Sequence, residues 1–247
     1  MRQTNAPVSL ALTNEGIRSL GAPVEVRRHP GARRLTLRVS RARRAVIVTL
    51  PLQCGLDEAD TFLKRNIGWI RERLDSLPRP VTFGDGVYMP FRGEVHRIVF
   101  SCRSGPRGVV RRVPGAPFPE LHVAGEPEFS GRRLAGWLAE EARSDLDKAA
   151  SVHSARLGVA PKRIAVRDQS SRWGSCSTTG VLSFSWRLIM APPAILDYVA
   201  AHEVAHLKEM NHGPRFWAFV RSTYPNVDYA KRWLQIYGMD LHRYGPA

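Results

Sequence analysis

The chain has 247 residues, of which 43% are hydrophobic, enough to bury one large or two small hydrophobic cores. No apolar run approaches the roughly 20 residues that a membrane-spanning helix needs, and Val8 to Leu12 is too short for a secretory signal peptide. Cys54, Cys102 and Cys176 are odd in number and far apart, which argues against a disulfide framework. We therefore expect a cytoplasmic protein with no membrane segment.

The formal net charge of +15 and the pI of about 10.8 indicate a polyanionic partner such as nucleic acid, or an anionic surface. A solvated sheet face is the alternative interpretation, because high arginine content can follow from genomic composition and no complete nucleic-acid-binding motif is present. Nucleic acid, bound through an arginine-rich surface, is therefore one of two open interpretations of this charge. The densest cluster contains Arg27, Arg28, Arg33, Arg34, Arg38, Arg41, Arg43 and Arg44.

Residues 1–22 are predicted to be a weakly ordered leader. The next segment, 23–50, alternates arginines with strand formers and predicts a β-hairpin with its turn at 40–43. A helix over 57–77 follows, with Phe62, Ile70 and Leu74 on its apolar side. Short strands such as 95–100 and 121–123 come next, separated by glycine and proline clusters.

From Gly131 the pattern becomes helical and continues to a stop at Gly158. Strands are predicted over 163–167 and 181–186, joined by a polar loop over 170–180. Pro192-Pro193 opens a helix that reaches about Lys208, and two more helices are predicted over 215–223 and 229–237. This order of elements is typical of an α+β fold.

The most informative motif lies in the helix that Pro193 opens. His202-Glu203-Val204-Ala205-His206 is a His-Glu-x-x-His box, and His212 follows six residues after it. Residues four apart on a helix share a face, so His202 and His206 can bind one metal ion. With His212 they supply three nitrogen ligands and leave one position of a tetrahedral zinc site open. The spacing predicts a zinc hydrolase with His202, His206 and His212 as metal ligands.

Glu203 is expected beside that open position. Zinc lowers the pKa of bound water to about 7, and an adjacent carboxylate can take its proton during attack on a carbonyl. The same carboxylate can pass the proton to the leaving amine. The motif therefore predicts zinc-bound water as the nucleophile and Glu203 as the general base. In the competing interpretation, the two histidines belong to an ordinary helix and Glu203 is a solvated charge.

His212 has the offset of the third ligand in the metzincin pattern His-Glu-x-x-His-x-x-Gly-x-x-His, but Glu209 replaces the glycine. Asn211 tolerates the left-handed conformation and could turn the chain two residues later. The chain is therefore not a standard metzincin. The alternative makes His212 a turn residue before a helix opened by Gly213-Pro214.

Four segments around the box carry a resemblance to a known family. They are Ser171-Arg172-Trp173-Gly174-Ser175-Cys176-Ser177, Phe184-Ser185-Trp186-Arg187-Leu188, Asp197-Tyr198-Val199 and Asn211-His212-Gly213-Pro214-Arg215-Phe216-Trp217. Together they resemble the YgjP-like metallopeptidases, relatives of the SprT-like zincins. The arginine-rich hairpin, Trp69 and the Phe83-Gly84-Asp85-Gly86 turn resemble the family more loosely.

The resemblance implies a zincin-like metallopeptidase domain that uses Zn²⁺, with the three histidines as ligands and Glu203 as catalytic base, in a soluble prokaryotic protein. Some SprT-like proteins act on proteins attached to DNA, which adds interest to the positive charge. The division that we expect is a leader over 1–22, a β-rich, arginine-rich region with one helix over 23–130, and the metallopeptidase domain over 131–247.

Residues near the box receive narrower predictions. Trp173 and Trp186 are expected to pack in the core rather than bind substrate. Cys176 is expected to be a small buried residue rather than a nucleophile or a ligand. Asp197 either holds a ligand imidazole in its tautomer or is an exposed helix charge. The loop over 173–176 and the strand over 181–186 are candidate substrate or scaffold elements, since an extended peptide could add to the edge of a strand that lines the cleft.

Two functions remain open at this stage. The first is a zinc-dependent metallopeptidase, an endopeptidase or aminopeptidase, that hydrolyses peptide bonds in protein or peptide substrates. The second is a zinc-stabilised nucleic-acid or protein-binding module with weak or no peptidase activity. Glu203 favours the enzyme, because a structural zinc site needs no carboxylate and usually fills its fourth ligand position. The sequence indicates neither the oligomeric state nor the cleavage preference.

Overall fold

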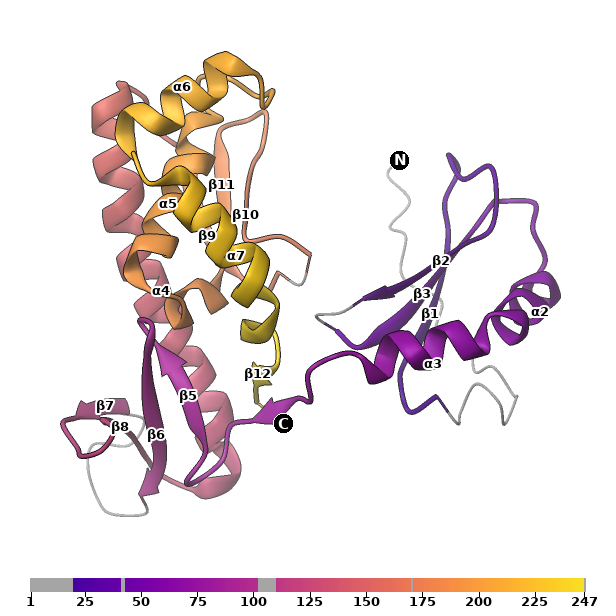
Figure 1. Cartoon of the computed structure of the whole chain (residues 1–247), viewed down its shortest axis with the longest axis horizontal. Helices are drawn as coiled ribbons and strands as arrows, with labels where there is room; N and C mark the ends of the chain where they lie inside the picture. Colours follow the sequence, from indigo (N-terminus) through magenta and orange to yellow (C-terminus); the bar gives the residue numbers. More distant parts are fainter. Residues whose placement is uncertain (1–19, 41–42, 102–109, 170, 247) are drawn as a thin grey trace. The chain divides into compact units, whose positions relative to one another are not determined.

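The computed structural model of the chain describes residues 20–40, 43–101, 110–169 and 171–246. Helices and mixed sheets form two compact units, Met1–Arg79 and Pro80–Ala247 (Figure 1), and the predicted α+β class is confirmed. Most of the predicted leader lies outside the described residues. Among these residues, no helix combines the length and the apolar character that crossing a membrane requires.

The first unit contains a sheet of β1 (Val24–Arg28), β2 (Thr36–Ser40) and β3 (Ala45–Leu50) in the order β1-β3-β2. The predicted hairpin is present as the antiparallel pair β2 and β3, and β1 adds to β3 in parallel. Its predicted turn includes residues 41–42, which lie outside the described residues. Alternate side chains of the strands, such as Val46 and Val48, are buried in this unit's core.

Two helices, α2 (Leu56–Arg65) and α3 (Ile67–Asp75), replace the single helix predicted over 57–77. The break is at Asn66, whose backbone leaves the helical region and whose Nδ2 donates a hydrogen bond to Phe62 O over 2.7 Å. An asparagine amide competes in this way with the helix's own hydrogen bonds. Ile70 and Leu74 are buried as predicted.

The second unit begins with β4 (Val81–Thr82), β5 (Tyr88–Phe91), β6 (Glu94–Ser101), β7 (Val110–Val113) and β8 (Glu120–Ala124). The last four of these strands form a sheet in the order β5-β6-β8-β7. The long helix α4 (Pro127–Leu157) follows and ends at Gly158, whose φ of +60° is the left-handed cap expected of a helix-terminating glycine.

A second sheet, of order β10-β11-β9, consists of β9 (Arg163–Arg167), β10 (Gly174–Cys176) and β11 (Val181–Ser185). Strand β10 lies within the stretch predicted as a polar loop. A 3₁₀ helix, η1 (Trp186–Met190), leads to α5 (Pro193–Ala205), α6 (Pro214–Thr223), α7 (Val227–Leu241) and β12 (Tyr244–Gly245). Helix α5 ends earlier than the predicted Lys208.

The unit boundary differs from the division predicted from composition, which grouped 23–130 together. Strand β12 pairs in parallel with β4, so the C-terminal residues are hydrogen-bonded to residues 81–82. The sheet of β5 to β8 also shares one core with α4, through residues such as Ile98 and Leu134. Composition carries no information on these long-range contacts.

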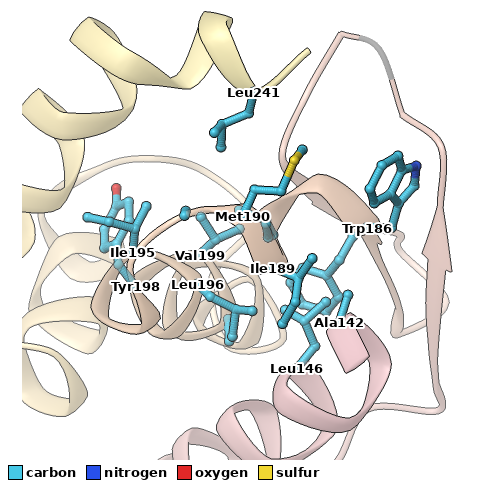
Figure 2. Close-up of a cluster of buried hydrophobic side chains, with 14 of the residues drawn as sticks. Ala142, Leu146, Trp186, Ile189, Met190, Ile195, Leu196, Tyr198, Val199 and Leu241 are labelled. Atoms are coloured by element: carbon cyan, nitrogen blue, oxygen red, sulfur yellow. The ribbon is translucent and has the colours of Figure 1, made fainter. Parts of the chain in front are cut away.

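Helix α5 is apolar on nearly all sides, because α4, α6, α7 and η1 surround it. Figure 2 shows the packing: Ala142 and Leu146 of α4 and Ile189 and Met190 of η1 meet residues of α5. The helix that carries the His-Glu-x-x-His box is thus fixed on several sides, as a precise site requires.

Candidate active site

The three histidines come together at the end of α5. His202 lies in the last turn of this helix, His206 caps the helix one turn later, and His212 reaches them from the connection between α5 and α6. The Nε2 atoms of His202 and His212 are 3.1 Å apart, and the rings of His206 and His212 have centroids 4.6 Å apart. One nitrogen from each imidazole lies within 4.8 Å of the other two, so the group is suited to hold one metal ion.

The chain turns toward His212 through hydrogen bonds rather than through a left-handed residue. Among the described non-glycine residues, positive φ occurs at Arg44 and Arg92, so the expectation for Asn211 is wrong. Glu209 Oε1 accepts a hydrogen bond from Asn211 N over 3.2 Å, and Asn211 O accepts one from Gly213 N over 2.7 Å. These bonds bring His212 back over α5 just before Pro214 begins α6.

Burial favours the neutral, metal-binding form of two of the imidazoles, His202 and His206. His206 Nδ1 lies 3.1 Å from Glu209 O and donates to it, which leaves Nε2 free for the cluster. Burial, followed by the charges of His206 and His212, lowers the pKa of His202 to about 3, so this ring is neutral at neutral pH. Burial also lowers the pKa of His206. Neutral imidazoles with converging nitrogens fit a cation such as zinc.

Glu203 is 5% exposed and follows His202 directly on α5. Its carboxylate lies against Gly174 of β10, where a Cβ atom would meet Oε1 at 2.5 Å. Burial raises the pKa of Glu203 to about 8, opposed by the positive charge of Arg172. A bound cation would lower that pKa again, because an opposite charge favours the ionised carboxylate. The side chain is therefore placed to exchange a proton near neutral pH.

A cavity of about 270 Å³ opens over these groups. Cys176 is partly buried at this cavity, and burial, with the charge of Glu203, raises the pKa of its thiol. A protonated thiol is a poor nucleophile and a poor metal ligand, which agrees with the prediction that Cys176 serves neither role. The lining residues are Gly174, Ser175, Cys176, His202, Glu203, His206, Met210 and His212.

The two predicted core tryptophans differ in their surroundings. Trp186 is 6% exposed and packs edge-on against Phe83, as expected of a core residue. Trp173 is half-buried; its ring lies 4.7 Å from that of His242 and against Gly238. Trp173 thus holds the β10 loop against α7.

Asp197 does not orient a ligand imidazole. Its Oδ1 accepts a hydrogen bond from His153 Nε2 over 2.9 Å, on α4. The partner that sequence reasoning missed for His206 is the backbone carbonyl of Glu209. A carbonyl of this kind has no signature in a sequence, because every residue carries one.

Three converging imidazoles beside a buried carboxylate define the class of the site, a metallohydrolase of the His-Glu-x-x-His type. The family model described as YgjP-like, metallopeptidase domain, matches residues 33–237. The chain therefore belongs to the YgjP-like metallopeptidase family, as its motifs predicted, and is a peptidase whose family implies a bound metal.

Among solved structures, the chain is similar to the metallopeptidase zymogen abylysin of Pyrococcus abyssi, with 18% identity and a TM-score of 0.34. The similarity covers 36% of this chain and 92% of abylysin. No curated protein matches the chain.

Proposed function

We propose that the chain hydrolyses peptide bonds of protein or peptide substrates with zinc as its metal and Glu203 as general base. The observation that carries this proposal is the position of Glu203, buried on α5 between two histidines and open to the same cavity. A purely structural metal site would not need this carboxylate at its edge.

His202, His206 and His212 would hold the metal, and a set of three imidazoles suits zinc. When bound, zinc would activate a water molecule and polarise the scissile carbonyl. The Glu203 carboxylate would accept a proton from the attacking water and deliver it to the nitrogen of the leaving amine. Glu209 would keep His206 in place through the hydrogen bond to its backbone carbonyl.

Strand β10 is the natural support for an extended substrate. It is the edge of the sheet β10-β11-β9 and contributes Gly174, Ser175 and Cys176 to the cavity. An edge strand offers unpaired backbone groups that can bind a peptide by strand addition. A peptide bound there would pass directly beside the Glu203 carboxylate.

Substitution of the base tests the proposal. Glu203→Gln is expected to retain zinc, measured by elemental analysis, and to lose about 10²- to 10⁴-fold in turnover of an unfolded protein mixture. Glu140→Gln, the same change at an exposed position of α4, is the matched control. Unchanged turnover in Glu203→Gln would remove this residue from the mechanism.

A second candidate function, nucleic-acid binding by the first unit, has one specific observation in its favour. Arg33, Arg34 and Arg38 are exposed and have no hydrogen-bond or ion-pair partner among the described residues. Arg27 and Arg43, in contrast, share Glu25 at 2.6 and 2.8 Å. Three unpaired arginines on one sheet and its loop suit phosphate groups.

The charge reversals Arg34→Glu and Arg38→Glu, made together, test this second function. If the sheet binds nucleic acid, the pair should weaken binding of labelled single-stranded RNA or DNA about tenfold or more and reduce its salt dependence. Arg65→Glu with Arg73→Glu, on the helices of the same unit, changes the charge equally. If both double variants lose the same affinity, binding depends on net charge alone. If neither loses affinity, the arginine-rich sheet does not bind nucleic acid.

A further inference from the structure

One face of helix α7 contacts residues that lie next to those lining the active-site cavity. Lys231, Gly238 and His242 lie seven and four residues apart and share that face. Gly238 and His242 contact Trp173, which precedes Gly174 of β10, and Figure 1 shows α7 beside α5. The face thus lies against Trp173, the residue before the β10 segment that lines the cavity.

Lys231, on the same face, contacts an aromatic residue that lies close to two of the histidines. Its Nζ lies 4.3 Å from the ring centroid of Trp217, a cation–π contact. The Trp217 ring in turn lies 5.8 Å from that of His202 and 6.0 Å from that of His212. Lys231 therefore contacts a tryptophan whose ring also lies close to two of the three histidines.

Two further cations lie near residues of the site. Arg221 of α6 has its guanidinium carbon 6.0 Å from the Trp217 ring. Arg172 adjoins Trp173, and its charge opposes the burial that raises the pKa of Glu203. Lys231 and Arg172 are exposed, and neither forms an ion pair with a carboxylate among the described residues.

Two carboxylates lie in or next to the segments that line the cavity. Glu203 is the one carboxylate among the described residues that line the cavity, and proton transfer requires it. The Glu209 carboxylate accepts the hydrogen bond from Asn211 N. Neither carboxylate forms an ion pair with Lys231 among the described residues, and an exposed cation attracts ligands of the opposite sign.

We propose that the cleft selects peptide substrates that carry a carboxylate near the scissile bond, with Lys231 as the specificity-determining residue and Arg172 as a second cation. This inference rests on the proposed peptidase function. The ammonium of Lys231 keeps N–H donors for a ligand while its charge lies over Trp217. The carboxylate belongs either to an aspartate or glutamate side chain or to the C-terminus of the substrate chain.

A binding measurement tests the inference independently of turnover. The zinc-loaded full chain with Glu203→Gln is titrated into fluorescent dodecapeptides, and anisotropy is recorded. One peptide carries three glutamates, its partner three glutamines, both with amidated C-termini; a third has glutamines and a free C-terminus. We expect the glutamate peptide or the free C-terminus to bind about 3- to 10-fold more tightly than the neutral peptide, the effect of a partly exposed ion pair.

Substitutions of Lys231 show whether that preference belongs to this residue. Lys231→Glu should abolish or reverse the preference, whereas Lys231→Arg should keep it. Lys148→Glu, an equal change at an exposed position of α4 that lines a different cavity, should leave it intact. Equal binding of all three peptides, or a preference that survives Lys231→Glu, overturns the inference.

Cleavage by the wild-type chain separates this inference from the proposed function. Cleavage of a peptide library made from digested cell protein should show acidic residues enriched around the cut, and Lys231→Glu should lose the enrichment. Cleavage without a carboxylate preference would sink the inference and leave the peptidase function standing. A carboxylate preference in binding without any cleavage would support the inference about selectivity and contradict the proposed peptidase function.

Discussion

Gly174 and Glu203 lie so close together that position 174 has no room for a side chain. A Cβ atom there would come within 2.5 Å of Glu203 Oε1 and 2.6 Å of its Cγ. Strand β10 cannot easily move away, because Gly174 is paired with Phe184 of β11, whose side chain is fully buried. The absence of a side chain at this position therefore determines where the Glu203 carboxylate lies.

Gly174→Ala should therefore reduce peptidase activity without removing the metal. The added methyl group would push the carboxylate from its place, and a misplacement of about 1 Å can cost about 10²-fold in rate. Gly136→Ala is the matched control, since nothing lies within 4 Å of the added atom on α4. Turnover, zinc content and the thermal unfolding temperature should be measured for both variants. Full activity in Gly174→Ala would show that catalysis tolerates displacement of the carboxylate.

The motif residues of this site were predictable because their chemistry depends on local spacing. His202, Glu203 and His206 lie within two turns of one helix, and His212 follows closely in sequence. Gly174 was predicted only as part of a family motif, and Lys231 was not predicted at all. The roles that we propose for them depend on contacts between segments about thirty residues from the box, and the periodicity of a sequence does not reveal such contacts.

Removal of the third histidine tests the metal site. His212→Ala leaves two imidazoles on α5, and zinc affinity should fall by about 10²-fold or more, since three protein ligands usually hold a catalytic zinc. The measurement is zinc content by elemental analysis after dialysis against a weak chelator. Asp197→Asn, five residues before His202 on α5 but bonded to His153, should keep its zinc. Equal zinc content in His212→Ala and wild type would exclude His212 as a ligand.

The fold was predicted best where one segment determines its own structure. The end of the long helix at Gly158 and the strand over 163–167 were located correctly, since a terminating glycine and the residue pattern mark them, whereas the helix begins at Pro127 and not at the predicted Gly131. Predictions were wrong where a side chain competed with the backbone, as Asn66 does at the break between α2 and α3. The partner of Asp197 could not be predicted either, because His153 lies on another helix.

Acidification should weaken the second unit through His96. This fully buried ring donates from Nδ1 to Glu94 O over 2.9 Å and accepts at Nε2 from Arg112 Nε over 2.8 Å, so it is neutral. Burial lowers the pKa of His96 below its usual 6.5, and the charge of Arg112 adds to this effect, against the Glu94 carbonyl. Protonation would place two donors face to face.

Proton linkage determines whether acid raises or lowers the stability of the folded chain. Since the folded state has the lower pKa, the unfolded chain binds more protons below pH 6.5. The stability that neutral His96 contributes is complete above pH 6.5 and declines as the pH falls toward the folded pKa. NMR titration of the imidazole should give a pKa below 6.5, and Arg112→Ala should raise it. A wild-type value at or above 6.5 would contradict the assignment.

Arg44 and Arg34 belong to the same arginine cluster but should differ in their effect on stability. Arg44 donates to the carbonyls of Leu74, Leu77 and Pro78, between 2.8 and 3.3 Å, and so satisfies the C-terminal end of α3. Arg44→Ala should cost about 1–3 kcal/mol by removing the donor of the Leu77 and Pro78 carbonyls and one of the donors of the Leu74 carbonyl, which also accepts from Leu77 N. Arg34→Ala, at an exposed position without a partner among the described residues, should stay within about 0.5 kcal/mol of wild type.

Hydrogen exchange measures both variants within the full chain. In Arg44→Ala, amides of β3 and α3 should exchange faster while those of α5 stay protected, because the two units have separate cores. Arg44 also has a φ of +45°, so Arg44→Gly should recover part of the loss by relieving the backbone. Equal exchange in Arg44→Ala and Arg34→Ala would mean that the carbonyls of α3 do not depend on this guanidinium, and reversal of Arg44 would then be a clean probe of nucleic-acid binding.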